Sequence, residues 1–178
     1  MKDNLEEDSQ IAFLGDKIES FSVTENSELV ELIEEYEPEV IAANVGLEQP
    51  AEELSKDEQD LKDEGHIFTP DSHREKTVKR LQTLKAQITH ETGLQPNFIR
   101  FEPQISAKEL AIDGDKALEG YGVDASDIGS VGEFDAVVGA VTARFYQENQ
   151  YEDLGVVVPE PVRNGREEDN KKNLDPRA

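Results

Sequence analysis

Several side chains that can bind metal ions or move protons stand at the ends of apolar segments in this sequence. Asn44 and Glu102 each follow a short apolar run of the kind that forms a buried strand. Asp135 stands near the start of an apolar helix, two residues after Glu133. Oxygen ligands from separate elements around one cleft suit Mg²⁺ or Mn²⁺, and such metals activate water for phosphodiester hydrolysis. The placement suggests a metal site whose candidate ligands are Asp135, Glu102, Asn44 and Glu133.

The predicted helix that carries Asp135 has two distinct faces. At about 100° per residue one face is apolar, as in a core-facing helix, and it is made of Phe134, Val137, Val138, Val141 and Phe145. The opposite face is made of residues small enough for another element to approach closely, namely Ala136, Gly139 and Ala143. Asp135 falls on the border between these faces, in the expected first turn. It is either a helix-start residue that the helix dipole favours or a metal ligand, and the pattern leaves both open.

The chain is strongly acidic. Its 178 residues include 41 acidic and 18 basic side chains, which give a net charge of -23. Such a surface repels nucleic acid at long range and keeps a protein soluble. It is typical either of a protein adapted to high salt, where self-repulsion is screened, or of an ordinary acidic protein. In so acidic a chain some carboxylates fall at strand and helix ends by chance, so spacing alone is a weak indication of a metal site.

The composition excludes several classes of site. The sequence has no cysteine, so it offers no disulfide, thiolate metal site or cysteine nucleophile. No apolar run reaches the ~20 residues needed to cross a bilayer, and the acidic N-terminus does not resemble a signal peptide. The sequence lacks the glycine-rich phosphate loops of the Rossmann and Walker types, which argues against a nucleotide cofactor. We therefore expect a cytoplasmic protein without a membrane partner.

Apolar patterning and turn residues predict an α/β domain with a mixed sheet. Strands are expected at 10–14 and 17–23, as a hairpin with the two-residue turn Gly15-Asp16, and at 40–45 and 98–102. The continuous apolar run 40–45 is typical of a strand that is buried on both faces. Because a helix is expected between the hairpin and this strand, the connection is a crossover and the strand should have a parallel neighbour.

Helices are expected between and after these strands. They run from a cap at Asn26 or Ser27 to before Pro38, weakly over 52–62, from Pro70-Asp71 to Gly93, over 106–112 and 115–121, and from about 133 to 146. The long helix has an apolar stripe made of Val78, Leu81, Leu84 and Ile88. Residues 1–9 and the charged tail 159–178 are expected to be disordered, and 10–158 to form a single domain.

The long helix also concentrates basic residues that could contact phosphate groups. Arg74, Lys79 and Arg80 are the candidates for nucleic-acid contact. The alternative is a solvated helix face, because Lys79 and Arg80 lie well away from the apolar stripe of the helix. No aromatic residues are interleaved with the basic ones to stack on bases. His66 and His73 bracket the loop before this helix, but without cysteine or a metal-ligand spacing they give little support for a zinc site.

Three segments resemble one known family. The segment Val40-Ile-Ala-Ala-Asn-Val-Gly-Leu-Glu-Gln-Pro50 is similar to a strand and loop of the pattern apolar-apolar-Ile-Asp-Ala-Pro-Leu-x-x-Pro. Phe98-Ile-Arg-Phe-Glu-Pro103 resembles an apolar-Ile-Glu-x-x-Pro strand, and Ser106–Ile112 resembles the short helix that follows it. The segment 133–146 resembles a closing Asp-Ala-x-x-Ala-x-Thr-Ala helix. Over about residues 10–157 the chain therefore resembles domain-of-unknown-function family 429, whose members are predicted nucleases with the RNase H fold.

The resemblance implies an RNase H-like mixed sheet flanked by helices, with acidic metal ligands on the first strand, the fourth strand and the last helix. Asp135 stands at the last-helix position and Glu102 at the fifth-strand position, so both would be catalytic ligands of Mg²⁺ or Mn²⁺. Asn44 replaces the fourth-strand aspartate and is a neutral, weaker ligand. The family's first strand, with its own aspartate, has no visible counterpart in this sequence. Without it the sheet would lose a central member as well as a ligand.

Three functions remain open on the sequence. The first is a metal-dependent nuclease that acts on nucleic acid through an incomplete acidic site. The second is a non-catalytic binding or scaffolding relative that keeps the fold. The third is an acidic decoy that imitates nucleic acid, which the net charge motivates. We favour the first as the label for the family and the second as the state of this particular chain.

Overall fold

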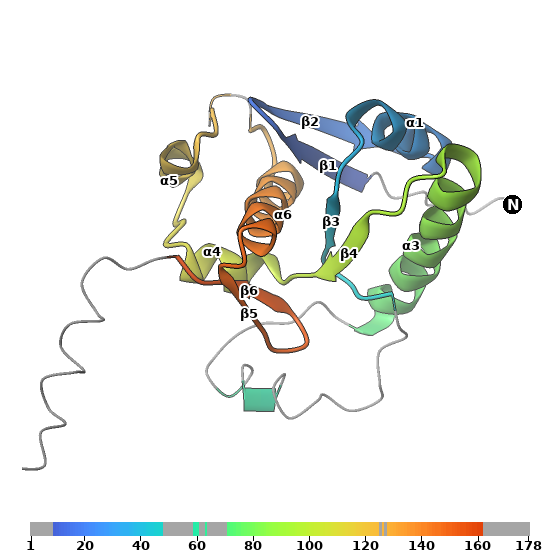
Figure 1. Cartoon of the computed structure of the whole chain (residues 1–178). Helices are drawn as coiled ribbons and strands as arrows, with labels where there is room; N and C mark the ends of the chain where they lie inside the picture. Colours follow the sequence, from blue (N-terminus) through green and yellow to red (C-terminus); the bar gives the residue numbers. More distant parts are fainter. Residues whose placement is uncertain are drawn as a thin grey trace, which may run out of the picture.

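The computed structural model describes residues 9–47, 59–60, 63, 71–124, 126 and 128–161. Its elements follow in the order β1 (Ser9–Leu14), β2 (Ile18–Val23), α1 (Asn26–Tyr36), β3 (Val40–Ala43), α3 (Asp71–Thr92), β4 (Asn97–Arg100), α4 (Pro103–Glu109), α5 (Asp115–Leu118), η1 (Glu119–Tyr121), α6 (Val131–Gln147), β5 (Tyr151–Asp153) and β6 (Val157–Pro159) (Figure 1). Within these ranges the protein is mixed α/β, with three two-stranded sheets. The predicted class is confirmed at this level.

β1 and β2 form the predicted antiparallel hairpin, but its turn is longer than expected. Leu14 pairs with Ile18, so three residues rather than two connect the strands. Ser9, expected in a disordered end, is already the first residue of β1. The ring of Phe13 stacks on that of Tyr36 in α1, with centroids 4.2 Å apart. This contact attaches the hairpin to the helix that follows it.

α1 begins where the sequence predicted, but the predicted cap residues are wrong. Glu25 is the N-cap, and its backbone N–H donates to the carboxylate of Glu28 in a capping box. The side chain of Asn26 is used instead to contact α3, where its Oδ1 accepts from Arg80 Nε at 2.9 Å. The prediction of Asn26 as the cap rested on residue type alone, and it failed because the Asn26 side chain is engaged in a tertiary contact with α3.

β3 and β4 form a parallel pair, which confirms the predicted parallel neighbour. Their register runs from Val40 opposite Asn97 to Ala43 opposite Arg100. β3 is shorter than the expected strand 40–45, and all of its residues are only partly buried. Both faces of β3 pack with a core, Ile41 and Ala43 with one and Ala42 with another, but burial is less complete than expected because one edge of the strand lines a cavity rather than another strand.

The two long helices match their predicted apolar faces. In α3 the stripe is buried, with Val78, Leu81, Leu84 and Ile88 at most 9% exposed. The helix ends before Gly93, whose φ of 76° is the left-handed conformation that glycine adopts at helix ends. In α6 the predicted face is buried at Val137, Val138, Val141 and Phe145, and Phe134 packs partly buried against the same core.

The hairpin of β5 and β6 is the element that the sequence reasoning missed. It follows α6 directly, and β6 is buried throughout. Val156 and Val158 pack on Ile105 of α4 in a small separate core. A run of three valines gives no alternation, and Tyr151–Asp153 is polar, so neither strand shows the period-two pattern of a half-buried hairpin.

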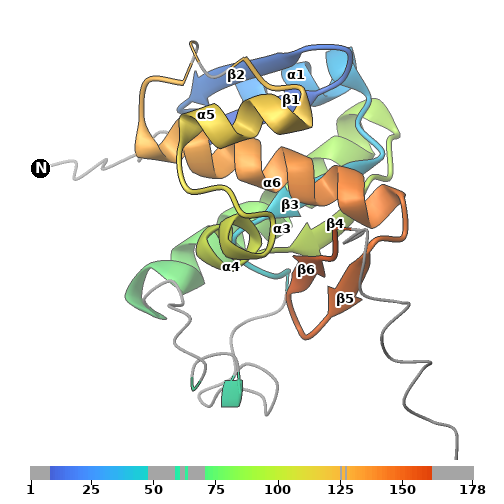
Figure 2. The ribbon, with the colours of Figure 1, turned by 90° about the vertical axis from the view of Figure 1, so that its left-hand side faces the viewer.

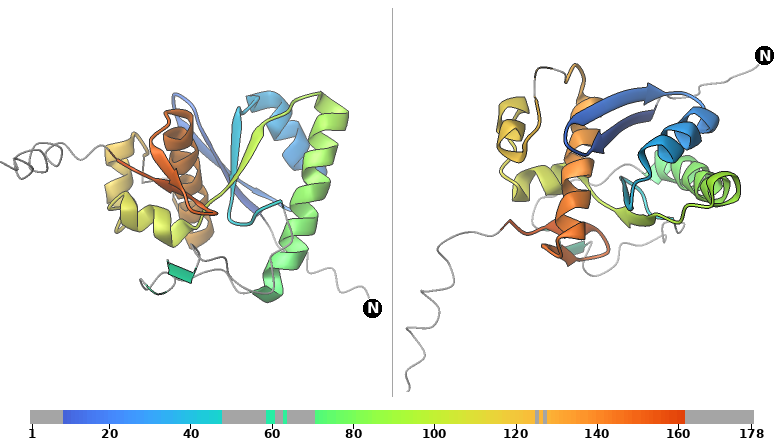
Figure 3. Two further views of the ribbon diagram at one scale, coloured as in Figure 1. Left: turned by 60° about the horizontal axis from the view of Figure 1, so that its bottom comes forward. Right: turned by 45° about the horizontal axis from the view of Figure 1, so that its top comes forward.

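The strands of the first two sheets lie between two layers of helices. α1 and α3 cover one side and α6 covers the other (Figure 3). α4 and α5 lie outside α6, on its side away from the strands (Figure 2). Each layer has its own core, one built on α1 and α3 and the other on α6. Successive residues of β1 serve the two cores in turn, since Ile11 and Phe13 pack with the first while Ala12 and Leu14 pack with the second.

The single mixed sheet that we expected is not formed within the described ranges. β1 pairs with β2 and β3 pairs with β4, but no ladder joins the two pairs. The disordered tail expected from residue 159 is wrong at its start, because Pro159 is a buried residue of β6. The expectations for residues 1–8, for most of the weak helix 52–62, for His66 and for residues 162–178 lie outside the described residues. Where the chain is described, no helix is long and apolar enough to cross a membrane.

Candidate functional site

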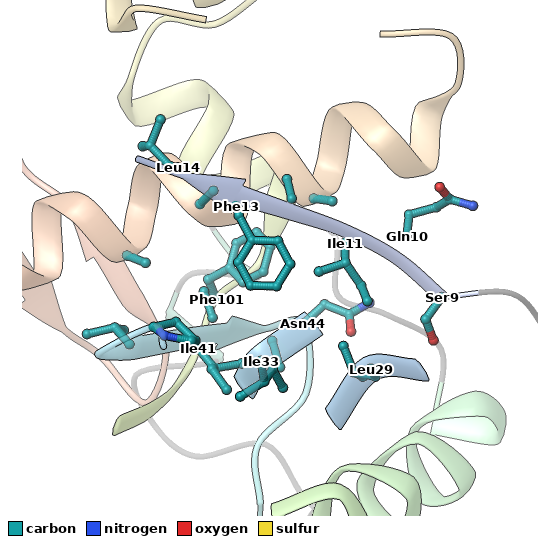
Figure 4. Close-up of a pocket in the computed structure, with 18 of the residues that line it drawn as sticks. Ser9, Gln10, Ile11, Phe13, Leu14, Leu29, Ile33, Ile41, Asn44 and Phe101 are labelled. Carbon is teal, nitrogen blue, oxygen red and sulfur yellow. The ribbon is translucent and has the colours of Figure 1, made fainter. Parts of the chain in front are cut away.

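A cavity of about 730 Å³ lies between β1 and β3 (Figure 4). Both strands line it over their whole length, since every residue of 9–15 and of 37–45 contributes to its wall. The remaining wall comes from α1, α3 and α6, with Phe101 and Pro103. We call this space the interstrand cavity.

The small-residue face of α6 closes one side of the interstrand cavity. The residues that line it there include Gly132, Ala136, Ala140 and Ala143. Gly139, on the same predicted face, is in a different situation, because a Cβ added at this position would lie 2.6 Å from the Phe101 ring. The close approach predicted for this face is therefore confirmed at Gly139, while its neighbours in the helix face open space.

The opposite side of the interstrand cavity is mainly apolar. It is formed by side chains of α1 and α3, which include Leu29, Ile33, Leu81 and Leu84. Tyr36 completes this wall and donates its hydroxyl to Glu19. That hydrogen bond raises the pKa of Tyr36 to about 12, so the hydroxyl stays protonated and keeps its donor role at neutral pH.

Asp135 lines the interstrand cavity, but it is not a helix-start residue. α6 begins at Val131, earlier than predicted, which places Asp135 in the second turn. Ser130 is the N-cap, and its Oγ accepts the backbone N–H of Glu133 at 3.2 Å. Glu133 in turn accepts the N–H of Gly129 at 2.8 Å. The helix-start role that was one interpretation of Asp135 is therefore filled by Glu133.

The carboxyl group of Asp135 is half-buried at the cavity wall. Burial raises its pKa above the usual range for an aspartate, because the charged form loses hydration. Asn44, exposed and directly after β3, lines the same cavity. Asp135 and Asn44 therefore border the same cavity, which is what the structure shows of the predicted ligand set.

Glu102 lies apart from the lining of the interstrand cavity. Its side chain is only 3% exposed, and its Oε1 is 3.4 Å from Nη2 of Arg100, which is itself 15% exposed. A carboxylate buried this deeply needs a cationic partner, because desolvation penalises an isolated charge heavily. Its backbone carbonyl accepts the N–H of Ser106 at the start of α4. These contacts give Glu102 a structural role at the junction of β4 and α4.

The residues do not fit the metal that the resemblance implies. Among the residues that the structure describes, no three or more Asp, Glu, His or Cys side chains are grouped so that they could hold a metal ion. Glu133 is used as a cap and Glu102 as the partner of Arg100, which leaves Asp135 and Asn44 at the cavity. One carboxylate and one amide are few ligands for a divalent cation that prefers six oxygens.

The basic candidates on α3 have contacts within the protein. Lys79 Nζ is 2.8 Å from Glu75 Oε1 in an exposed pair one helical turn apart. Arg80 donates to the carbonyl of Thr24 and to Asn26, and so ties α3 to the start of α1. The side chains of Arg74 and His73 lie outside the described part of the chain. The described contacts favour the solvated, structural interpretation of this face over nucleic-acid contact.

Comparisons with known proteins give no match: no family model, curated protein or solved structure is similar to this chain. The residues that the sequence reasoning missed are those of the strand edges around the interstrand cavity. One signal pointed to them: the family's first strand, a central member of the sheet, has no visible counterpart in this sequence. The argument for function therefore rests on the cavity itself.

Proposed function

We propose that this chain is a non-catalytic binding protein, an α/β domain that resembles RNase H-like nucleases but does not assemble their acidic site. The observation that carries the proposal is the position of Glu102. Its buried carboxylate is paired with Arg100 and lies outside the lining of the cavity to which Asp135 and Asn44 contribute. The cavity is bordered by apolar walls and strand edges, which suit binding rather than hydrolysis.

The test is an assay for hydrolysis together with an assay for metal binding. Purified protein is incubated with single- and double-stranded DNA and RNA in Mg²⁺ or Mn²⁺, at low and at high salt. Mn²⁺ binding is measured in parallel by isothermal titration calorimetry. We expect no hydrolysis and no Mn²⁺ affinity stronger than about 1 mM. Hydrolysis by the wild type that is lost in Asp135→Asn would overturn the proposal.

A metal-dependent nuclease is the second candidate. It is favoured by the half-buried Asp135, whose raised pKa is common among functional carboxylates, and by Asn44 at the same cavity. This candidate needs at least one further carboxylate beside Asp135, since the described residues do not supply it. It predicts that Asp135→Ala and Glu102→Ala both weaken Mg²⁺ or Mn²⁺ binding. A loss in the first variant alone would exclude Glu102 from the site.

A further inference from the structure

Two strand edges face each other across the interstrand cavity. In the described structure β1 has a ladder only with β2, and β3 only with β4. The carbonyls of Glu39 and Ala43 accept hydrogen bonds from the β4 segment. Because backbone groups of successive strand residues alternate in direction, Val40 and Ala42 direct their N–H and C=O groups to the other side. That side is the interstrand cavity, which both residues line.

The two edges lie in one layer. Along β1, alternate residues pack with the α1–α3 core and with the α6 core. β3 does the same, since Ile41 and Ala43 pack with the first core and Ala42 with the second. A chain that entered the cavity in this layer would present its side chains alternately to the same two cores, as a strand does.

The two strands also run in opposite directions along α6. β1 begins beside the start of that helix, where a Cβ added to Gly132 would lie 2.8 Å from Gln10 Cγ. β3 begins beside its end, where Gln147 donates to Glu39 at 3.2 Å. Asn44 lies toward the end of the cavity at which β1 begins (Figure 4). An added strand would therefore be parallel to one neighbour and antiparallel to the other, whichever way it ran.

We propose that the interstrand cavity binds one extended segment of a partner polypeptide, which adds as a strand between β1 and β3. This inference rests on the proposed binding function and identifies its ligand. The segment would join the two sheets into one of five strands, because each edge supplies the backbone groups of half a ladder. Main-chain hydrogen bonds would supply affinity, and the two cores would select the side chains.

The walls define the chemistry of that segment. It is apolar on both faces, because both faces become buried between helices. On the side of α6 the small residues Ala136, Ala140 and Ala143 leave room for large aliphatic side chains. Near one end, Gln10 Oε1 is a buried acceptor without a hydrogen-bond partner, and an N–H of the bound segment would satisfy it. Basic residues should flank the apolar part, since this protein carries a net charge of -23.

The residues of this sequence that the structure does not describe do not include such a segment. In the residues that the structure does not describe, the longest apolar run is the pair Ile67-Phe68. The segments 1–8, 48–58 and 162–178 are rich in charged residues. A strand buried on both faces needs a nearly continuous apolar run of four or more residues. The excess of acidic side chains favours a partner polypeptide with basic residues beside the apolar run as the source of the segment.

The test uses a fluorescein-labelled peptide with six alternating valine and isoleucine residues between two pairs of lysines. Binding to the full chain is followed by fluorescence anisotropy. We expect a Kd of about 10 µM, and at least a tenfold loss when prolines replace alternate apolar residues, because proline cannot donate to a ladder. Equal binding of the two peptides, or no binding of either, would overturn the strand proposal.

Two variants locate the binding site. Ala140→Phe places an aromatic ring in the interstrand cavity and should weaken binding at least tenfold. Val131→Phe is the matched control, because Val131 is on the same helix, is 78% exposed and does not line the cavity. Its affinity should equal that of the wild type. Equal binding by wild type and Ala140→Phe would place the peptide elsewhere and overturn the proposal.

The identity of the occupant is tested by the mass of the protein in solution. Light scattering without peptide should give the monomer mass. A dimer that the peptide dissociates would make a second copy the occupant and overturn the assignment to a separate polypeptide. If peptide binding fails and nucleic acid is also left intact, the strand proposal falls and the non-catalytic assignment stands. If nucleic acid is hydrolysed and the peptide still binds, the non-catalytic assignment falls and the strand proposal stands.

Discussion

The small-residue face of α6 meets two different environments along one helix. At Gly139 the Phe101 ring fills the space that a side chain would need. At Ala136 and Ala143 the helix faces the interstrand cavity instead. Small residues on one helix face thus mark a finished contact, that is, a close-packed one, at Gly139 and an unfilled space at Ala136 and Ala143. Small residues in a sequence predict that something approaches, but they do not say whether it belongs to the same chain.

The finished contact should be the most sensitive to change. Gly139→Leu would force a side chain into the ring of Phe101, which is buried in the α6 core. Overpacking of this kind costs about 2–3 kcal/mol of unfolding free energy, partly offset by the better helix propensity of leucine. Urea denaturation followed by circular dichroism measures the loss. Wild-type stability in this variant would mean that the ring moves away freely.

Removal of the charge on Glu102 should have the next largest effect. In Glu102→Gln the Arg100 guanidinium, whose side chain is 15% exposed, loses the charge of the carboxylate 3.4 Å away. We expect a loss of about 2 kcal/mol in the free energy of unfolding, because removing one charge from a largely buried ion pair is destabilising. Glu75→Ala, which breaks the exposed pair with Lys79, is the control and should change stability by less than about 0.5 kcal/mol. Equal losses would contradict a structural role for Glu102.

The open part of the α6 face should tolerate a larger side chain. Ala136→Leu extends into the interstrand cavity and should change the free energy of unfolding by less than about 1 kcal/mol. It should still weaken the valine–isoleucine peptide at least tenfold, by occupying the space of a bound side chain. Urea denaturation and anisotropy together separate the two effects. A large loss of stability would show that the space is already filled.

The smallest effect concerns the pH dependence that Asp135 contributes. Burial raises the folded-state pKa of this carboxyl group above its usual value of 3.8. The folded protein then holds the proton more tightly than the unfolded chain, so this group lowers stability as pH rises from 3.8 through the folded pKa. The variant Asp135→Asn has no carboxyl group at this position, so it does not lose stability in this way as the pH rises. The variant should gain slightly over the wild type between pH 3 and pH 7 in thermal unfolding, whereas a gain toward acid would contradict the sign of the shift.

Local signals in the sequence predicted most of the elements. The stripe from Val78 to Ile88 and the face from Val137 to Phe145 gave two helices with the correct buried sides. Gly93 marked the end of α3. The start of α6 was placed too late, because Ser130 was not recognised as its cap. These features depend on residues within a few positions of one another, which is why a single sequence contains them.

The candidate site was harder to predict, because its geometry depends on contacts distant in sequence. Asp135 and Asn44 both line the interstrand cavity, because the ends of the elements that carry them border the same space. Glu102 was expected to join them, but Arg100, two residues away on β4, holds its carboxylate elsewhere. Spacing along the chain cannot show which partner a buried carboxylate has. The cavity itself follows from the lack of pairing between two sheets, which no local pattern encodes.

The central claim is that the unpaired edges of β1 and β3 accept a strand. Amide hydrogen exchange at Val40 and Ala42, whose N–H groups are directed into the interstrand cavity, tests it most directly. With the valine–isoleucine peptide bound, exchange at these two amides should slow at least tenfold, while the exposed Lys79 of α3 should be unchanged. Unaltered exchange at Val40 and Ala42 under saturating peptide would contradict the account.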